Sequence, residues 1–200
     1  MFSSARRLLG TISAGCALSA ALLLVPTVSA AQAHLIDLET CNSNALSHPF
    51  APWGDTASYE LAPGGDFESS SWSLSGGAQL VPGSEPFAAT GSLGASSLSL
   101  PAGSSAQSPT TCVNAAYPSV RFFVGGTGTV AVSVVYNGLA IPTGVAVAAG
   151  SWTPTLAMLT TAPVLGLLSG GTAHVSLLVT GLTGSAQVDD VFIDPWMRGG

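Results

Sequence analysis

The feature that most constrains this chain is a succession of short runs rich in β-branched and aromatic residues, separated by glycine and proline. In residues 129–136, valine occupies every second position up to Tyr136, and residues 172–180 show the same alternation. A period of two with one apolar face is typical of a strand that packs on one side. The pattern therefore predicts β-sheet rather than helix.

Seven segments have the length and composition of strands and are bounded by turn-forming residues. They are Ser71 to Leu74, Ser96 to Leu100, Val120 to Val124, Thr129 to Tyr136, Gly144 to Ala148, Thr172 to Thr180 and Gln187 to Ile193. Asn137–Gly138 is a typical hairpin turn, and the apolar stretch from Leu156 to Leu168 is interpreted as strand plus loop because threonines, a proline and a glycine interrupt it. Parallel sheets need crossover helices, which are missing here, so we predict an all-β sandwich of about eight antiparallel strands.

The first 33 residues have the organisation of a signal peptide. Arg6 and Arg7 precede an apolar run from Leu8 to Val25, and small residues follow near Ala30 and Ala33. A membrane anchor is the alternative, because the run approaches the length that spans a bilayer. Its glycines, a following proline and the two cleavage-like sites favour removal. We therefore expect a secreted protein with no membrane insertion after cleavage.

Removal of this segment leaves about 170 residues, which suits one compact domain. Residues 34–58 are interrupted by prolines and a glycine, and we predict an irregular N-terminal arm there. Residues 59–200 are assigned to the β-sandwich domain.

The charge balance narrows the choice of partner. Beyond the signal peptide only Arg121 and Arg198 are basic, whereas the chain has ten Asp and Glu residues. Nucleic acids and anionic membrane surfaces attract proteins through basic side chains, so both are disfavoured. Neutral or cationic partners fit better.

Two cysteines remain beyond the signal peptide, Cys41 and Cys112. In an oxidising compartment two cysteines have a single intramolecular pairing, so we predict a Cys41–Cys112 disulfide. Such a bond would stabilise the fold by about 4 kcal/mol in the chain-entropy account. Metal ligation is the alternative, but the closely paired spacing of zinc ligands is absent.

No catalytic set is recognisable in the sequence. The three histidines lie outside any nucleophile–base motif, and no G-x-S-x-G sequence occurs. His174 is expected on the exposed face of a strand. We predict no catalytic residue.

Carboxylates form a more informative pattern. Asp66 and Glu68 lie in a glycine-rich turn, and Asp189 and Asp190 are adjacent in the last predicted strand. Adjacent strand residues point to opposite faces, so one of this pair is expected where an unpaired charge is costly. Ca²⁺ binds carboxylate and carbonyl oxygens, so these residues predict a structural calcium site. The alternatives are solvated acids, acids capped by backbone N–H groups, or a glycosidase acid–base pair of Glu68 with one of the two aspartates.

Aromatic side chains offer a second kind of site. An exposed indole or phenol ring can stack on the flat face of a sugar. Trp72 is expected in the core, because it lies two residues from Leu74 in a predicted strand. Trp152, at a glycine–serine turn, and Tyr117, beside a proline, are predicted to lie on a rim where they contact a ligand.

The order of these features resembles that of a known family. Phe67–Glu68, then Trp72, then Val120 to Phe123, then Trp152 and finally Val188 to Val191 resemble jelly-roll carbohydrate-binding modules with a galactose-binding-like fold. The resemblance covers residues 59–195 and implies a jelly-roll β-sandwich. It also implies that Glu68 and Asp190, with Asp66 or Asp189, hold a structural calcium ion.

A second resemblance concerns residues outside that pattern. Trp53–Gly54–Asp55, the Phe122–Phe123 pair and the two cysteines are similar to those of a group of secreted bacterial proteins. The strand pattern, the aromatic side chains and the missing catalytic set lead us to predict a secreted, non-catalytic, carbohydrate-binding-like domain with a structural calcium ion. A structural or protein-interaction β-sandwich of the cell envelope is the alternative, and a glycoside hydrolase is a further one.

Overall fold

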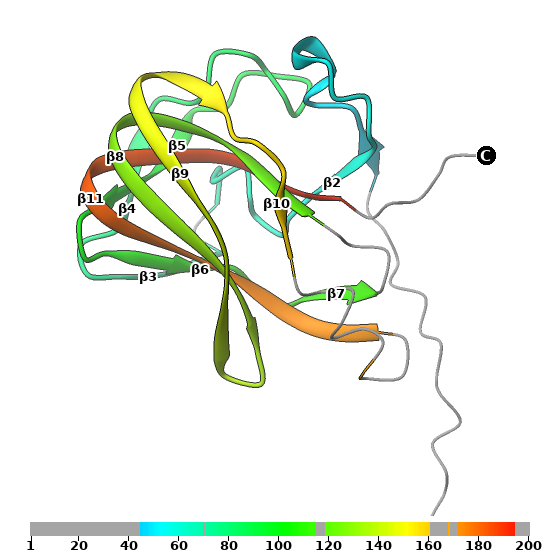
Figure 1. Cartoon of the computed structure of the whole chain (residues 1–200). Coiled ribbons are helices and arrows are strands. Elements are labelled where there is room, and N and C mark those ends of the chain that lie inside the picture. The colour runs from blue at the N-terminus through cyan, green and yellow to red at the C-terminus, as the bar shows by residue number, and fades with distance from the viewer. Residues whose placement is uncertain (1–44, 70, 115–118, 161–167, 169–171, 195–200) are drawn as a thin grey trace, which may run out of the picture. The chain divides into compact units, whose positions relative to one another are not determined.

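A computed structural model describes residues 45–69, 71–114, 119–160, 168 and 172–194 (Figure 1). The chain divides into two compact units, residues 1–35 and 36–200, and every described residue belongs to the second unit. The predicted signal peptide and the first part of the predicted arm lie outside the described residues, and so do Cys41 and Tyr117. The secretion signal stays a prediction.

The described part of the chain is built almost entirely from strands. One 3-10 helix, η1 (Ala51–Trp53), occurs among them. The strands are β1 (Leu46–Ser47), β2 (Tyr59–Leu61), β3 (Ser73–Ser75), β4 (Gln79–Pro82), β5 (Ser96–Pro101), β6 (Ser105–Gln107), β7 (Thr111–Asn114), β8 (Ser119–Tyr136), β9 (Leu139–Pro154), β10 (Met158–Leu159) and β11 (Thr172–Asp194).

Three long strands, β8, β9 and β11, form the centre of the architecture and curve side by side in Figure 1. The predicted turn joins β8 to β9, with Tyr136 opposite Leu139. Asn137 and Gly138 have φ angles of 49° and 78°. Two successive positive φ angles match the right-handed twist of the flanking strands, which is why this dipeptide closes the hairpin.

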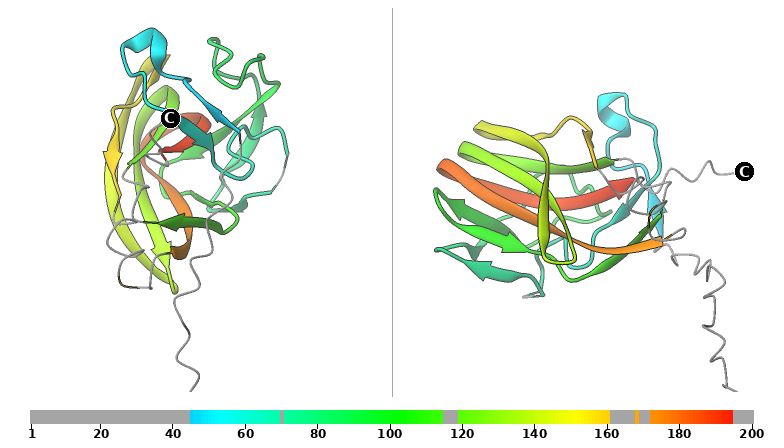
Figure 2. Two further views of the ribbon diagram at one scale, coloured as in Figure 1. Left: turned by 90° about the vertical axis from the view of Figure 1, so that its right-hand side faces the viewer. Right: turned by 60° about the horizontal axis from the view of Figure 1, so that its bottom comes forward.

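The short strands line the other edge of β11. Successive parts of β11 pair with β7, β6, β5 and β2, while β3, β4 and β1 add to β6, β5 and β2. Every pairing is antiparallel. In the left view of Figure 2, β8 and β9 lie on one side and the cyan-to-green strands of the first half of the chain lie on the other. The predicted antiparallel β-sandwich is therefore confirmed.

The main core lies between these layers and follows the predicted alternation. Val130, Val132 and Val134 of β8 are at most 1% exposed, and Leu177 and Val179 of β11 face the same core. Trp72 is buried there as predicted, and its indole N–H donates to the Pro63 carbonyl at 3.0 Å. A buried indole needs such a partner for its N–H.

Two predicted strand breaks are absent from the structure. Residues 120–124 and 129–136 belong to the single strand β8, because Gly126 and Gly128 adopt φ angles of +71° and +147° within the ladder. They pair with Ala186 and Gly184 of β11, which is likewise continuous. Glycine allows both strands to bend here without leaving the sheet. Within the described residues, additional short strands bring the count to eleven instead of about eight.

His174 is exposed on β11, as predicted. No helix within the described ranges is long and apolar enough to cross a membrane.

Candidate functional site

A second, smaller cluster of aromatic side chains lies on the outer face of the sheet. Phe122 and Phe123 follow one another in β8, so Phe122 joins the main core and Phe123 points to the opposite face. Phe192 of β11 points the same way as Phe123, and both are at most 1% exposed. We call Phe50, Tyr59, Phe123 and Phe192 the outer aromatic cluster.

The N-terminal arm covers this cluster and is more ordered than the sequence predicts. Its described part, residues 45–58, contributes β1, η1 and the fully buried Phe50. The Phe50 ring stacks on Phe123 with centroids 5.4 Å apart. Gly54 ends η1 with φ +82° and donates its N–H to the Ala51 carbonyl at 2.9 Å, a conformation that glycine adopts readily.

Two further rings extend this cluster to the surface. Trp53, in η1, is 40% exposed, and Phe87, in the loop after β4, is 42% exposed. Their centroids are 4.8 Å apart with an interplanar angle of 83°. Each ring also lies 5.5 Å from the buried Phe123. Trp53 and Phe87 thus form an aromatic patch supported from below by the core.

Trp152 lies against the same cluster rather than on a free rim. It is only partly exposed and packs against the outer aromatic cluster. A Cβ on Gly125 would lie 2.6 Å from the indole ring, so the ring occupies the space above this glycine. Contact of Trp152 with a ligand stays a prediction, and the predicted contact of Tyr117 lies outside the described residues.

Arg121 fastens the arm to the sandwich. Between residues 45 and 194 it is the only basic side chain, and it is 6% exposed. Its Nη1 donates to Asp55 Oδ2, while Nε and Nη2 donate to the Thr155 carbonyl at 2.8 and 2.6 Å. Its guanidinium carbon lies 4.0 Å from the Phe50 ring centroid, a cation–π contact.

Asp55 is the counter-charge in this arrangement, which we call the arm latch. Its Oδ1 accepts the Ala57 N–H at 3.1 Å, and its Oδ2 also accepts the Tyr59 hydroxyl at 2.7 Å. Burial alone would raise the pKa of Asp55, but the hydrogen bonds from Tyr59, Ala57 and Arg121 outweigh it and lower that pKa. Burial and the neighbouring Asp55 raise the pKa of Tyr59 to about 12. Asp55 is therefore ionised at neutral pH.

A different set of charges supports Phe87. Glu85 is 1% exposed, and its carboxylate accepts the N–H of Phe87 at Oε2 and of Ala89 at Oε1, the latter at 2.8 Å. The Glu85 N–H donates to Asp189 Oδ2 at 2.8 Å. The loop that carries Phe87 is thus tied to β11 through buried carboxylates.

Asp189 and Asp190 are both buried, at 0% and 4% exposure. A register shift in β11 follows Asp189, and Asp190 has φ +46°, so the two side chains do not simply alternate between faces as the sequence predicts. Burial raises the pKa of Asp189 to about 6. Burial, with the charges of Asp189 and Glu85, also raises the pKa of Asp190. We call Glu85, Asp189 and Asp190 the acidic corner.

The predicted metal residues are only partly brought together. Asp66 is close enough to Asp190 to raise its pKa, whereas Glu68 Oε1 accepts the N–H groups of Ala95 and Ser96 at 2.7 and 2.9 Å. Within the described ranges, no three His, Cys, Asp or Glu side chains are arranged to hold a metal ion. The acidic corner is therefore not a preformed carboxylate cage, and calcium binding stays a prediction.

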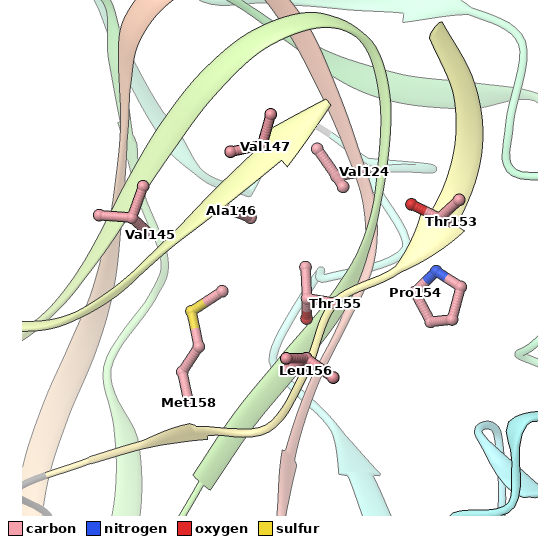
Figure 3. Close-up of a pocket in the computed structure, with 9 residues that line it drawn as sticks. All are labelled: Val124, Val145, Ala146, Val147, Thr153, Pro154, Thr155, Leu156 and Met158. Atoms are coloured by element: carbon pink, nitrogen blue, oxygen red, sulfur yellow. The ribbon is translucent and has the colours of Figure 1, made fainter. Parts of the chain in front are cut away.

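A hollow of about 250 Å³ lies beside β9 and β10 (Figure 3). Its lining residues are Val124, Val145, Ala146, Val147, Thr153, Pro154, Thr155, Leu156 and Met158. None of these side chains titrates, and the Thr155 hydroxyl already accepts the Phe122 N–H at 3.1 Å. The hollow is an apolar surface feature without acid–base groups of its own.

The glycosidase alternative considered from the sequence paired Glu68 with Asp189 or Asp190. Asp189 and Asp190 are buried, and both oxygens of Asp189 accept backbone N–H groups, from Glu85 at 2.8 Å and Asp190 at 2.9 Å. A sugar at the surface does not reach them. The predicted disulfide also stays a prediction, because Cys41 lies outside the described residues.

Sequence reasoning missed three residues of this region: Trp53, Phe87 and Glu85. The first lies in a segment interpreted as irregular, and the other two lie in a loop. The adjacent Phe122–Phe123 pair was the available signal, because consecutive aromatic residues in a strand require an apolar environment on both faces. A segment rich in Phe and Trp elsewhere in the chain was then needed to cover the second face.

Comparison with known proteins finds similar chains among solved structures. No protein-family description matches the chain, and no curated protein is similar to it in sequence. Among solved structures, the C-terminal CBM6 of LamC, a marine laminarinase from Zobellia galactanivorans, is 12% identical with a TM-score of 0.44, over 61% of this chain and 90% of that one.

Two further structures are similar to the same extent. TmCBM61, solved with β-1,4-galactotriose, is 18% identical with a TM-score of 0.41, over 65% of this chain and 94% of that one. CsCBM6-3 from Clostridium stercorarium, solved with cellobiose, is 18% identical with a TM-score of 0.42, over 61% and 86%. The chain thus resembles carbohydrate-binding modules in its β-sandwich. Similarity with such low sequence identity and TM-score does not identify a ligand of this chain.

Proposed function

We propose that the aromatic patch of Trp53 and Phe87 binds a neutral carbohydrate. The observation that carries this proposal is the pair of half-exposed rings, 4.8 Å apart and anchored on the buried Phe123. An exposed aromatic ring held rigidly by a core offers an apolar face on which the C–H face of a sugar stacks. Two exposed rings on a small surface are otherwise unfavourable in water.

The electrostatics of the region favour a neutral ligand. Arg121, the only arginine or lysine between residues 45 and 194, is buried and bonded to Asp55 and Thr155. It is therefore not presented to an anionic sugar. Glu85 is buried as well, and its two oxygens accept N–H groups of its own loop. Ring stacking, rather than ion pairing, is left to provide affinity.

A glycan array with the secreted, oxidised domain tests this proposal. Binding of the domain to one class of neutral glycan, and loss of that binding in Trp53→Ala and Phe87→Ala, is the expected result. Val147→Ala provides the matched control, because Val147 is 67% exposed and apolar but lies on β9 outside the patch. Absence of binding to every glycan would overturn the proposal.

A protein-interaction role in the cell envelope is a second candidate. Val145, Val147 and Leu156 are 58%, 67% and 85% exposed and border the hollow beside β9 (Figure 3). Within the described ranges β9 pairs only with β8, and no charged side chain protects its outer edge. Capture of an envelope protein that is lost in Val147→Asp but kept in Trp53→Ala would favour this candidate.

We further propose that Ca²⁺ stabilises the sandwich at the acidic corner. The support is chemical: buried carboxylates with raised pKa values gain from a hard cation that binds oxygen. Asp190 and Asp66 would be its carboxylate ligands, and backbone oxygens would have to complete the shell. Thermal unfolding with EDTA and with added calcium tests this, because a ligand of the folded state raises the midpoint.

A further inference from the structure

We propose that the Asp55–Arg121 latch is a positioning device that docks the N-terminal arm so that Trp53 completes the aromatic patch. The ligand part of this inference rests on the proposed carbohydrate-binding function. Docking of the arm concerns the protein without a ligand, so it depends only on the contacts that Asp55 and Arg121 make.

The patch is assembled from two segments that are held independently. Phe87 is fixed by the carboxylate of Glu85 in its own loop. Trp53 belongs to the arm, whose described strand β1 forms only the pairs Leu46–Glu60 and Ser47–Tyr59 with β2. Two residue pairs are a weak attachment for a segment that carries half of a binding surface. Further contacts must therefore hold the arm.

Phe50 packs on Phe123 and Phe192 of the sheet, and the polar contacts of the arm centre on Arg121. The guanidinium group bonds Asp55, the Asp55 carboxylate accepts the Tyr59 hydroxyl, and the Phe50 ring lies against the cation. The other two bonds of the guanidinium group go to the neutral Thr155 carbonyl. When the arm leaves, Arg121 loses both its counter-charge and its aromatic partner. A buried cation without its counter-charge is strongly unfavourable, so the docked arm is favoured over a partly detached one.

This arrangement links docking of the arm to binding at the patch. If only the docked form presents Trp53, the apparent dissociation constant rises in proportion as the docked fraction falls. By linkage, a bound sugar must then protect the arm against opening. Asp55 acts here on Trp53 and not on the sugar.

The test combines hydrogen exchange with sugar binding on the whole secreted chain. Asp55→Asn keeps the size of the side chain and removes its charge, and Tyr59→Phe is the matched control that removes one hydrogen bond from Asp55. The reporting amides are those of Trp53 and Gly54, which donate to Phe50 and Ala51 within the arm at 3.0 and 2.9 Å. The amides of β8 and β11 report the stability of the sandwich itself.

In Asp55→Asn we expect the protection of the Trp53 and Gly54 amides to fall by about tenfold, the effect of losing a charge-assisted hydrogen bond. The central amides of β8 and β11 keep their protection. The apparent dissociation constant for a glycan identified on the array rises by the inverse of the docked fraction that remains, and saturating glycan restores the protection. Tyr59→Phe changes both quantities by less than about threefold.

Unchanged arm protection in Asp55→Asn overturns the latch, whether or not any sugar binds. A sugar affinity that does not follow the docked fraction measured by hydrogen exchange overturns the positioning role and leaves carbohydrate binding intact. If the unaltered protein binds no glycan, the proposed function fails, and hydrogen exchange alone decides whether the latch exists.

Discussion

The arm latch and the acidic corner both hold a segment of the aromatic patch through a carboxylate, but they differ in how that charge is balanced. At the latch, Asp55 meets Arg121, and its pKa is lowered. At the corner, Asp189 and Asp190 lie among other acids, Glu85 and Asp66, with hydrogen bonds from backbone N–H groups and Ser84, and their pKa values are raised. The comparison shows that burial of a carboxylate does not by itself stabilise the fold. Whether its pKa is raised or lowered depends on the groups beside it.

The two regions should therefore respond oppositely when a charge is removed. Removing the charge of Arg121 or of Asp55 leaves the other residue of the latch without its counter-charge. Neutralising the corner relieves repulsion between buried acids.

Arg121→Met is expected to lower the free energy of unfolding by about 3 kcal/mol, because removing one partner of a buried ion pair leaves the other uncompensated. Urea unfolding followed by tryptophan fluorescence measures this change. Asp190→Asn is the matched control, since it also removes one charge from a buried site. Equal destabilisation by both variants would contradict the expected difference between the arm latch and the acidic corner.

The pH dependence of stability is the second prediction. For Asp189 and Asp190 the folded-state pKa lies above the unfolded value near 4, so the folded protein holds more protons between about pH 4 and pH 8. The free energy of unfolding in EDTA should then fall as the pH rises from 5 to 8, because the folded protein must release protons that the unfolded chain has already lost.

The latch contributes with the opposite sign and at lower pH. The pKa of Asp55 is lowered on folding, so its stabilisation is complete above the unfolded value and is lost as the pH falls through the folded value. Urea unfolding from pH 3 to pH 8 measures both effects. A free energy of unfolding that rises steadily up to pH 8 would contradict the proposed state of the acidic corner.

The third prediction concerns the variant Asp190→Asn and tests whether calcium binds at the acidic corner. In EDTA at pH 8 the variant should be more stable than the unaltered protein by about 1 kcal/mol, because the amide removes a buried charge. Asparagine also tolerates the left-handed conformation found at this position.

Calcium should raise the unfolding midpoint of the unaltered protein at pH 8 and leave that of Asp190→Asn unchanged. Differential scanning calorimetry with EDTA and with calcium makes this comparison. An equal calcium response in both proteins would remove Asp190 from the proposed metal ligands, and no response in either would remove the metal from the corner.

Much of the sandwich could be predicted because it depends on residues that are close in the sequence. The alternating valines of residues 130–134, the Asn137–Gly138 turn and the burial of Trp72 follow from period two, turn geometry and ring size. The continuity of β8 could not be predicted, because glycines such as Gly126 and Gly128 are typical of a turn between two strands. Their pairing with β11 depends on contacts with residues far along the chain.

The candidate site was less predictable for the same reason. Trp152 appeared to lie on a rim, but its ring is placed by Gly125, which the sequence does not show to be its neighbour. Trp53 and Phe87 meet only because the arm and a loop reach the same face of β8. Asp55 and Arg121, separated by 65 residues, pair only once the sheet exists.

Carbohydrate binding by the aromatic patch is the central claim, and the indole N–H signals of the protein in nuclear magnetic resonance test it most directly. The titrant is the neutral oligosaccharide bound best on the glycan array. We predict that the Trp53 indole signal shifts saturably with added sugar, while that of Trp72, which is buried and bonded to Pro63, stays in place. Binding that leaves the Trp53 signal unmoved, or the absence of any glycan that binds, would contradict the claim.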